Sequence, residues 1–332
     1  MLIQLFLLML GLVLIIKSAD ILVDSAAKLA RRYGVSTFII GISVIAFGTS
    51  APELAVGIVS GISHTNQLTL GDVLGSNIAN MALIAGLAAV IFPIRVHDSA
   101  VRREIPVLIA VSILLAALIL TDGRLSRAEG ILLLAAFGVY IFIIARDAKK
   151  SMQIHIDAEG DIDTDGDGNN LPPEPADAGN QNIVPKLWIF SLLSLCGLFL
   201  GGKLTVDSST HLAEFLGLNQ TLIGLTVVAI ATSMPELITS IVAARKKEPD
   251  IVLGNCVGSN ILNILLVLGL SGTISPIAVP GSLVFDFGVI LFLTLTVFAV
   301  AALKKTIRRL TGIFLVTGYF VYIAVKVIGA LR

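Results

Sequence analysis

Two short motifs place a carboxylate inside apolar segments that are long enough to span a bilayer. The first is GTSAPEL at 48–54 and the second is ATSMPEL at 231–237. Each joins a hydroxyl pair, a proline and a glutamate, which is Glu53 or Glu236. A lone buried carboxylate is costly in hydrocarbon. Two of them facing each other therefore predict a cation between them.

The prolines of the two motifs free further oxygen atoms. Pro52 and Pro235 lack an N–H, so the carbonyls about four residues earlier lose their donors. A membrane tolerates such carbonyls only where they line a cavity or bind a cation. The neighbouring hydroxyls add neutral oxygen ligands, from Thr49, Ser50, Thr232 and Ser233.

A second motif, GSNIxN, follows each glutamate and adds more oxygen donors. Its serine and its last asparagine are four residues apart, so they share one face of a helix. All the candidate ligands are hard oxygen donors without His or Cys, which favours calcium, sodium or potassium over zinc or copper. The four residues of this second motif are Ser76, Asn80, Ser259 and Asn263.

The composition indicates an all-α polytopic membrane protein. The chain has 332 residues, 56% hydrophobic and 14% charged, with a mean hydropathy of +0.95. A spanning helix needs roughly 20 mostly apolar residues, and this length criterion predicts ten transmembrane helices. We expect them at 3–23, 36–60, 68–92, 104–121, 127–145, 186–205, 219–243, 251–274, 283–303 and 310–330.

Charge and cysteine content exclude several classes of function. The net charge is zero, so there is no basic footprint for a nucleic-acid partner. Cys196 and Cys256 both lie in apolar runs, so no disulfide framework is expected. We expect no cofactor and no enzyme activity, and the sequence leaves the oligomeric state open, a monomer included.

The distribution of Lys and Arg predicts the orientation in the membrane. Most of them fall in alternate loops, and the loop 146–185 is one of these, because it contains Arg146, Lys149 and Lys150 although it is acidic as a whole. Such loops face the cytoplasm, so we expect a multi-pass protein of the cell membrane with both termini outside. The N-terminal segment lacks a basic start and a cleavage site, and is interpreted as the first span rather than a signal peptide.

The chain contains an internal duplication. Residues 34–94 align without a gap to 217–277 at a constant offset of 183, with 25 of 61 positions identical. Five predicted spans separate the two copies, and an odd number of crossings predicts opposite orientations. Inverted repeats of this kind are typical of secondary transporters. The expected organisation is a five-helix half at 1–145, an acidic linker at 146–185 and a second five-helix half at 186–332.

The paired motifs resemble the two alpha repeats of the cation/calcium antiporter superfamily, most closely those of prokaryotic sodium/calcium exchangers. The resemblance implies that Glu53 and Glu236 are ligands shared by calcium and sodium. It also implies that the first and sixth spans slide across this core to alternate access. The remaining implied ligands are Thr49, Ser50, Thr232, Ser233, Ser76, Ser259, Asn80, Asn263 and the carbonyls of Ala46 and Ala229.

Asn263 is a departure from part of that superfamily. Some members, including potassium-dependent exchangers, carry an aspartate at this position, so Asn80 and Asn263 argue against potassium dependence and leave the stoichiometry open. Two other functions stay open as well. One is a proton/calcium antiporter, and the other is a cation channel, which passes current without coupling.

Two weaker signals lie outside the repeats' central motifs. Residues 163–174, DTDGDGNNLPPE, fit the EF-hand pattern, but the prolines before Glu174 favour a solvated linker over a regulatory calcium site. Asp24 and Asp207 correspond at the offset of 183, near the ends of the first and sixth spans. We interpret them as solvated helix-end residues, with ion guidance as the alternative.

Overall fold

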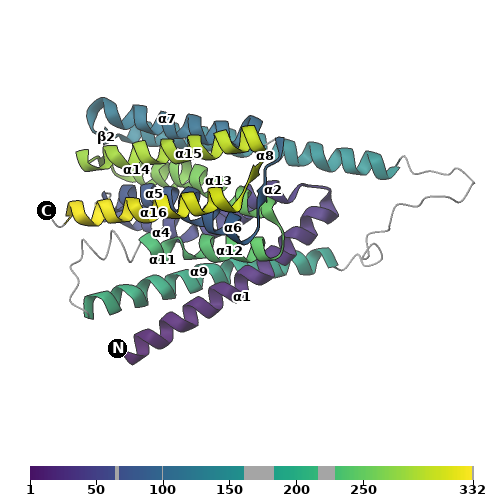
Figure 1. Cartoon of the computed structure of the whole chain (residues 1–332), viewed down its shortest axis with the longest axis horizontal. Coiled ribbons are helices and arrows are strands. Elements are labelled where there is room, and N and C mark those ends of the chain that lie inside the picture. Colours follow the sequence, from purple (N-terminus) through teal and green to yellow (C-terminus); the bar gives the residue numbers. More distant parts are fainter. Residues whose placement is uncertain (64–66, 99, 161–182, 216–228, 331–332) are drawn as a thin grey trace, which may run out of the picture.

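Long helices running side by side form the body of the protein (Figure 1). The computed structural model describes residues 1–63, 67–98, 100–160, 183–215 and 229–330. The helices of the first half are α1 (Leu2–Tyr33), α2 (Thr37–Ile40), the π-helix η1 (Gly41–Ile45), α3 (Ala46–Thr49), α4 (Ala51–Ile62), α5 (Gln67–Ile78), the π-helix η2 (Ala79–Ile84), α6 (Ala85–Ile91), the π-helix η3 (Ala100–Glu104), α7 (Ile105–Asp122) and α8 (Arg127–Gly160).

The second half repeats this order. Its helices are α9 (Ile183–Phe215), α11 (Ala229–Thr232), α12 (Met234–Arg245), α13 (Pro249–Leu262), the π-helix η5 (Asn263–Leu268), α14 (Gly269–Ile274), the 3-10 helix η6 (Gly281–Leu283), α15 (Val284–Lys304) and α16 (Arg309–Ala330). The breaks and π-helical turns of 37–91 recur in the described part of the second copy, close to the offset of 183.

Among the described residues, four two-residue strands join the halves, which the all-α prediction did not include. They are β1 (Ile94–Arg95), β2 (Arg124–Leu125), β3 (Ile277–Ala278) and β4 (Thr306–Ile307). β1 pairs antiparallel with β4, and β2 pairs antiparallel with β3. Each strand pair therefore takes one strand from each half. The sequence gives little signal for such short strands, because they have no room for an alternating pattern.

Seven described helices are long and apolar enough to cross a membrane. An eighth span results if the pair Thr37–Thr49 and Ala51–Ile62, bent by 46°, counts as one crossing. α7, with 18 residues, coincides with another predicted span. The predicted span 219–243 lies partly outside the described residues. The structure thus shows a polytopic helical protein, and the count of ten stays a prediction.

Helices of both repeats form the centre of the bundle, with 72% of the most apolar window of Thr69–Ile91 buried. In the most apolar window of Pro249–Ile274, 94% of residues are buried, against 17% in the corresponding window of α16. The peripheral helices instead expose large apolar side chains, such as Leu2 at the start of α1 and Leu310 at the start of α16. Apolar residues on the outside as well as the inside are what lipid contact requires.

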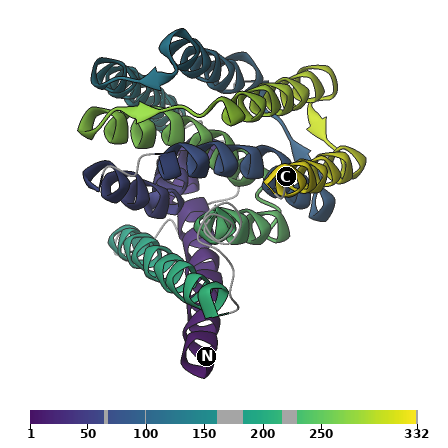
Figure 2. The ribbon, with the colours of Figure 1, turned by 90° about the vertical axis from the view of Figure 1, so that its left-hand side faces the viewer.

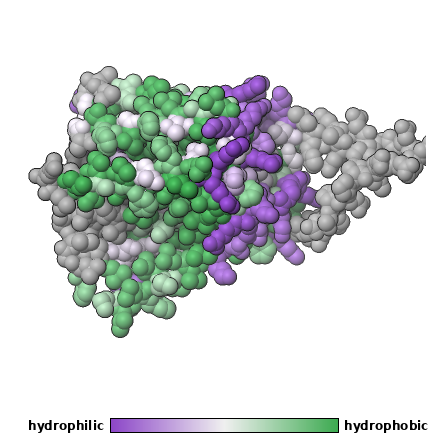
Figure 3. Space-filling view, viewed as in Figure 1, coloured by the Kyte–Doolittle hydropathy of each residue, from purple (hydrophilic) through white to green (hydrophobic). Residues whose placement is uncertain are grey.

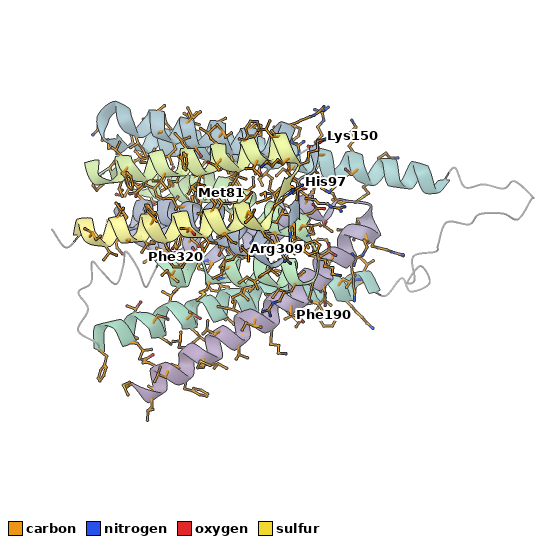
Figure 4. All side chains as sticks on the ribbon, viewed as in Figure 1. Met81, His97, Lys150, Phe190, Arg309 and Phe320 are labelled. Carbon is orange, nitrogen blue, oxygen red and sulfur yellow. The ribbon has the colours of Figure 1, made fainter. Side chains whose placement is uncertain are left out.

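Hydrophilic residues gather at one end of the bundle (Figure 3). This is the end where α8 finishes and α9 begins, and Lys150 and His97 lie there in Figure 4. Both chain termini lie at the opposite end (Figure 1). The helix α8 continues to Gly160, into the predicted linker, because residues 146–160 are rich in good helix formers such as Ala and Lys. The EF-hand-like segment 163–174 lies outside the described residues.

α1 and α9 pack against each other on one side of the bundle (Figure 2). Their backbones approach closely where two glycines meet. A Cβ added to Gly11 would lie 2.9 Å from the carbonyl oxygen of Gly201, and one added to Gly201 would lie 2.9 Å from that of Gly11. Small residues at such crossings let helices pack tightly in a membrane. The two helices therefore form a closely fitted pair.

We expect Gly11→Val to destabilise the protein because the added side chain forces α1 and α9 apart. The free energy of unfolding should fall by about 1–3 kcal/mol, the usual cost of overpacking. Thermal unfolding in detergent measures this. The matched control is Gly138→Val in α8, where an added Cβ meets nothing within 4 Å. Equal losses in the two variants would contradict the close crossing.

Candidate ion-binding site

Each glutamate motif forms a broken helix. In the first copy α3 ends at Thr49 and α4 begins after Ser50, whose φ and ψ are −83° and 9°. In the second copy Ser233 occupies the same place, with −79° and 2°. Proline suits the first turn of a helix, where no N–H is needed. The motif sequence therefore restarts the helix at the same point in both copies.

The break places the two glutamates in the first turns of α4 and α12. Glu53 and Glu236 are each only 1% exposed. Every other predicted side-chain ligand is at least nine-tenths buried too, so this conformation encloses the site. These residues are Thr49, Ser50, Ser76, Asn80, Thr232, Ser233, Ser259 and Asn263.

Four asparagines connect the two copies by reciprocal hydrogen bonds. Asn77 donates from Nδ2 to the carbonyl oxygen of Asn260 at 3.3 Å, and Asn260 donates from Nδ2 to the carbonyl oxygen of Asn77 at 3.2 Å. Asn80 donates to Oδ1 of Asn260 at 2.9 Å, and Asn263 donates to Oδ1 of Asn77 at 3.3 Å. The offset of 183 converts each of these bonds into its counterpart in the other copy. The copies are thus related locally by a pseudo-two-fold axis.

The threonines of the two motifs form a second reciprocal pair. Thr49 donates from Oγ1 to Oδ1 of Asn255 at 3.0 Å. Thr232 donates from Oγ1 to Oδ1 of Asp72, also at 3.0 Å. Asn255 and Asp72 are equivalent in the repeat, so the two copies share the geometry while the side chain changes from an amide to a carboxyl group.

The serines next to the glutamates break this symmetry. Ser50 donates from Oγ to Oε1 of Glu236 at 3.0 Å. Its equivalent, Ser233, donates instead to Oγ of Ser76 at 3.1 Å. As a result Glu53 has no hydrogen-bond partner on either carboxylate oxygen. The two carboxylates are therefore not interchangeable in this conformation.

A set of buried oxygen atoms has no hydrogen-bond partner, which is rare and costly in a protein interior. They belong to predicted ligands from both copies, and two of them sit in the π-helices η2 and η5, a kind of turn often found at functional sites. The atoms are both Oε of Glu53, Oε2 of Glu236, Oγ of Ser259, and Oδ1 of Asn80 and Asn263. Oxygen donors of this kind suit a calcium or sodium ion.

The carbonyl predicted as a ligand at Ala46 already accepts two hydrogen bonds. They come from the backbone N–H of Ser50 at 3.0 Å and from Oγ1 of Thr49 at 3.3 Å. Ala229 opens α11 at the equivalent position. Coordination by the Ala46 carbonyl therefore requires these bonds to be exchanged. Within the described residues, no three His, Cys, Asp or Glu side chains lie close enough together to form a metal site.

Sequence reasoning did not assign a role to Asp72, Asn255 or Asn260. The repeat alignment contains the signal that finds them, because positions 72 and 77 are polar in both copies although they lie in apolar spans. An unpaired side-chain amide in hydrocarbon is costly. Polar residues duplicated at this depth therefore indicate mutual hydrogen bonding.

α9 crosses the bundle directly over both prolines. A Cβ added to Gly202 would lie 3.3 Å from Cγ of Pro52 and 3.3 Å from Cγ of Pro235. A side chain at this position would require both prolines to shift by a few tenths of an ångström, so glycine fits the close approach of α9 to both breaks. The α1–α9 pair is thus in contact with the candidate site.

A family model described as "Sodium/calcium exchanger protein" matches residues 3–146 and 186–328. The chain belongs to the sodium/calcium exchanger protein family. The match stops at both edges of the segment between the two halves and covers the α1–α9 pair as well as the repeats.

Two relatives are similar over nearly their whole length. Inner membrane protein YrbG of Escherichia coli is 36% identical over 98% of this chain and 97% of its own. Sodium/calcium exchanger MaX1 of Methanosarcina acetivorans is 33% identical over 96% and 97%. Among solved structures, that of the sodium-calcium exchanger NCX_Mj soaked with Na⁺ and Sr²⁺ superposes with a TM-score of 0.81, at 27% identity over 97% of this chain and 98% of that one.

We expect Asn77→Ala and Asn260→Ala each to lower the free energy of unfolding by about 2–4 kcal/mol, because each leaves buried polar partners unsatisfied. The double variant should lose clearly less than the sum, since both substitutions break the same reciprocal bonds. Equilibrium unfolding of the three variants in detergent measures the coupling. Additive losses would show that the two side chains do not interact.

Proposed function

We propose that the protein is an antiporter that exports calcium in exchange for sodium across the cell membrane. The observation that carries this proposal is the enclosed set of unpartnered oxygens around Glu53 and Glu236. Two buried carboxylates have lost their hydration and repel each other. A cation between them offsets both energetic costs. A doubly charged cation neutralises both, and sodium ions satisfy the same oxygens in turn.

The relatives support the choice of ions. One full-length relative and one full-length structural neighbour bear the name sodium/calcium exchanger. The ligand set of carboxylate, hydroxyl and amide oxygens fits the ions in those names. We therefore assign calcium and sodium as transported substrates, with the ligands named above as the site.

We also propose that ten spans form two inverted five-helix repeats, and the reciprocal asparagine bonds support this arrangement. Segments in opposite membrane orientations are related by a two-fold axis in the plane of the membrane, and such an axis pairs equivalent residues reciprocally. Asn77 and Asn260 are paired in that way. With the basic loops cytoplasmic, both termini lie outside the cell.

Access alternates when the α1–α9 pair slides over the core. The pair lies on one side of the bundle (Figure 2), and its helix α9 packs against α4 and α12, with Gly202 facing the prolines of both breaks. Tightly packed α1 and α9 move as one body, and the site opens to one side of the membrane at a time.

A charged clamp holds α1 to the core at the polar end. Lys246, at the end of α12, lies 2.7 Å from Oδ1 of Asp20 and 2.8 Å from Oδ1 of Asp24. The side chain of Asp24 is 55% exposed, in agreement with the solvated interpretation, and it is paired as well. Burial alone lowers the pKa of Lys246, but the hydrogen bonds and charges of the two aspartates outweigh it and raise the pKa, so the ammonium stays charged.

The position equivalent to Lys246 is Ser63, so the other half cannot form the same clamp.

We expect Lys246→Met to favour the state open to the cytoplasm, because the clamp no longer holds α1 in place. The apparent affinity for cytoplasmic calcium should rise about two- to tenfold, as the competent fraction increases. Calcium-dependent exchange in inside-out vesicles measures it. The control is Lys247→Met, which removes the same charge one residue away. Equal effects of both variants would mean that charge, not the clamp, is responsible.

Transport itself is tested in proteoliposomes loaded with sodium. We expect calcium-45 uptake to depend on the outward sodium gradient, and Glu53→Gln and Glu236→Gln to abolish it, because either change removes half of the charge that balances calcium. Vesicles loaded with potassium or choline are the controls.

Each rival function predicts a different outcome of the same assay. Uptake that ignores sodium but follows a proton gradient indicates a proton/calcium antiporter. Calcium flux down its own gradient, without any counter-ion, indicates a channel. Either result would overturn sodium/calcium exchange as the function of this chain.

A further inference from the structure

Asp72 in α5 is a third buried carboxylate near the candidate site. It is 8% exposed. Its Oδ1 accepts the hydrogen bond from Oγ1 of Thr232, and its Oδ2 has no hydrogen-bond partner. Thr232 directly precedes the break between α11 and α12. Asp72 therefore contacts a proposed ligand residue at the point where the second repeat unwinds.

The equivalent residue of the second repeat shows what a purely structural group does at this position. Asn255 accepts from Thr49 with Oδ1, and its Nδ2 donates to Oγ of Ser240 at 3.1 Å and to the carbonyl oxygen of Glu236 at 3.4 Å. An amide thus serves as acceptor and donor together. An ionised aspartate keeps the acceptor, loses the donor and adds a negative charge.

That charge has no protein counter-ion. None of the ion pairs formed by described residues includes Asp72, and one of its oxygens is unpartnered. A buried carboxylate without a positive partner costs several kcal/mol. By contrast, Asp286, another buried carboxylate of the described part, pairs with Lys326 at 2.8 Å and accepts from Tyr322. The only cations that the proposed function brings near Asp72 are the transported ions.

We propose that Asp72 is a positioning residue that sets the preference of the site for calcium over sodium. This inference rests on the proposed exchange function. Asp72 accepts the hydrogen bond of Thr232 and adds a negative charge behind the ligands. The ligands Asn80 and Asn263 are themselves neutral. Because the electrostatic energy scales with the charge of the ion, this field stabilises bound calcium about twice as strongly as one bound sodium ion.

The test is Asp72→Asn, which is isosteric and keeps the acceptor for Thr232. Calcium-45 binding to the purified full-length protein, with sodium as competitor, gives both affinities. We expect the dissociation constant to rise about tenfold for calcium and about threefold for sodium. The thermal midpoint without ions should stay the same or rise, because the variant removes a charge that repels Glu53 and Glu236.

A structural role predicts the reverse pattern. In that case Asp72→Asn lowers the ion-free midpoint and weakens both ions by the same factor. Unchanged calcium affinity would also overturn the proposal. Asp286→Asn is the control, and it should lower the midpoint while leaving the ratio of the two affinities unchanged.

Failure of the underlying function is distinguishable from failure of this inference. Glu53→Gln tests the function, because it should eliminate specific calcium binding. If the wild-type protein itself does not bind calcium, the exchange function fails and the role of Asp72 fails with it. If the wild-type protein binds calcium and Asp72→Asn binds it equally well, only the role of Asp72 is wrong.

Discussion

The structure depends on how polar groups are satisfied in a place without water. In the middle of a membrane protein each buried polar group needs a partner from the protein itself or from a bound ion. Here the two repeats satisfy each other, since Asn77 and Asn260 exchange hydrogen bonds across the bundle. What this exchange leaves unsatisfied is a compact set of oxygens, among them both carboxylate oxygens of Glu53. The proposed ion exchange depends on these unpartnered oxygens.

Gene duplication explains why unpartnered oxygens gather at the centre of the bundle. Two copies of a broken helix bring two breaks, two glutamates and two sets of amides to one axis. Where the copies have kept the same residue, as at the asparagines, the contacts are reciprocal. Where they have diverged, as at Asp72 and Asn255, the same hydrogen bond from threonine is accepted by a carboxyl group on one side and by an amide on the other. Divergence within a symmetric frame thus provides a means to tune ion preference without changing the ligands.

Much of this arrangement was predictable from the sequence, because the bilayer imposes simple rules. Apolar length predicted a polytopic helical protein, and seven described helices are long and apolar enough to cross a membrane. Proline beside a buried glutamate predicted the breaks, which the structure shows at Ser50 and Ser233. The predicted side-chain ligands are all buried, although their coordination of ions stays a prediction.

Other features depend on contacts that span residues far apart in the chain, and no local pattern encodes them. The pairing of Lys246 with Asp20 and Asp24 joins positions more than half the chain apart. The reciprocal bonding of Asn77 with Asn260 is similar, although the repeat placed both residues at one depth. The two-residue strands are too short to show a period. Which serine bonds which glutamate depends on small differences between nearly symmetric environments.

The most direct measurement of the central claim is the position of a bound divalent ion. Anomalous scattering from crystals of the protein soaked with Sr²⁺, a heavier substitute for calcium, locates the ion without assumptions about transport. The account predicts one strong peak between Glu53 and Glu236, at coordination distance from both carboxylates and lost in Glu53→Gln. Peaks confined to the polar end, with none at the glutamates, would contradict it.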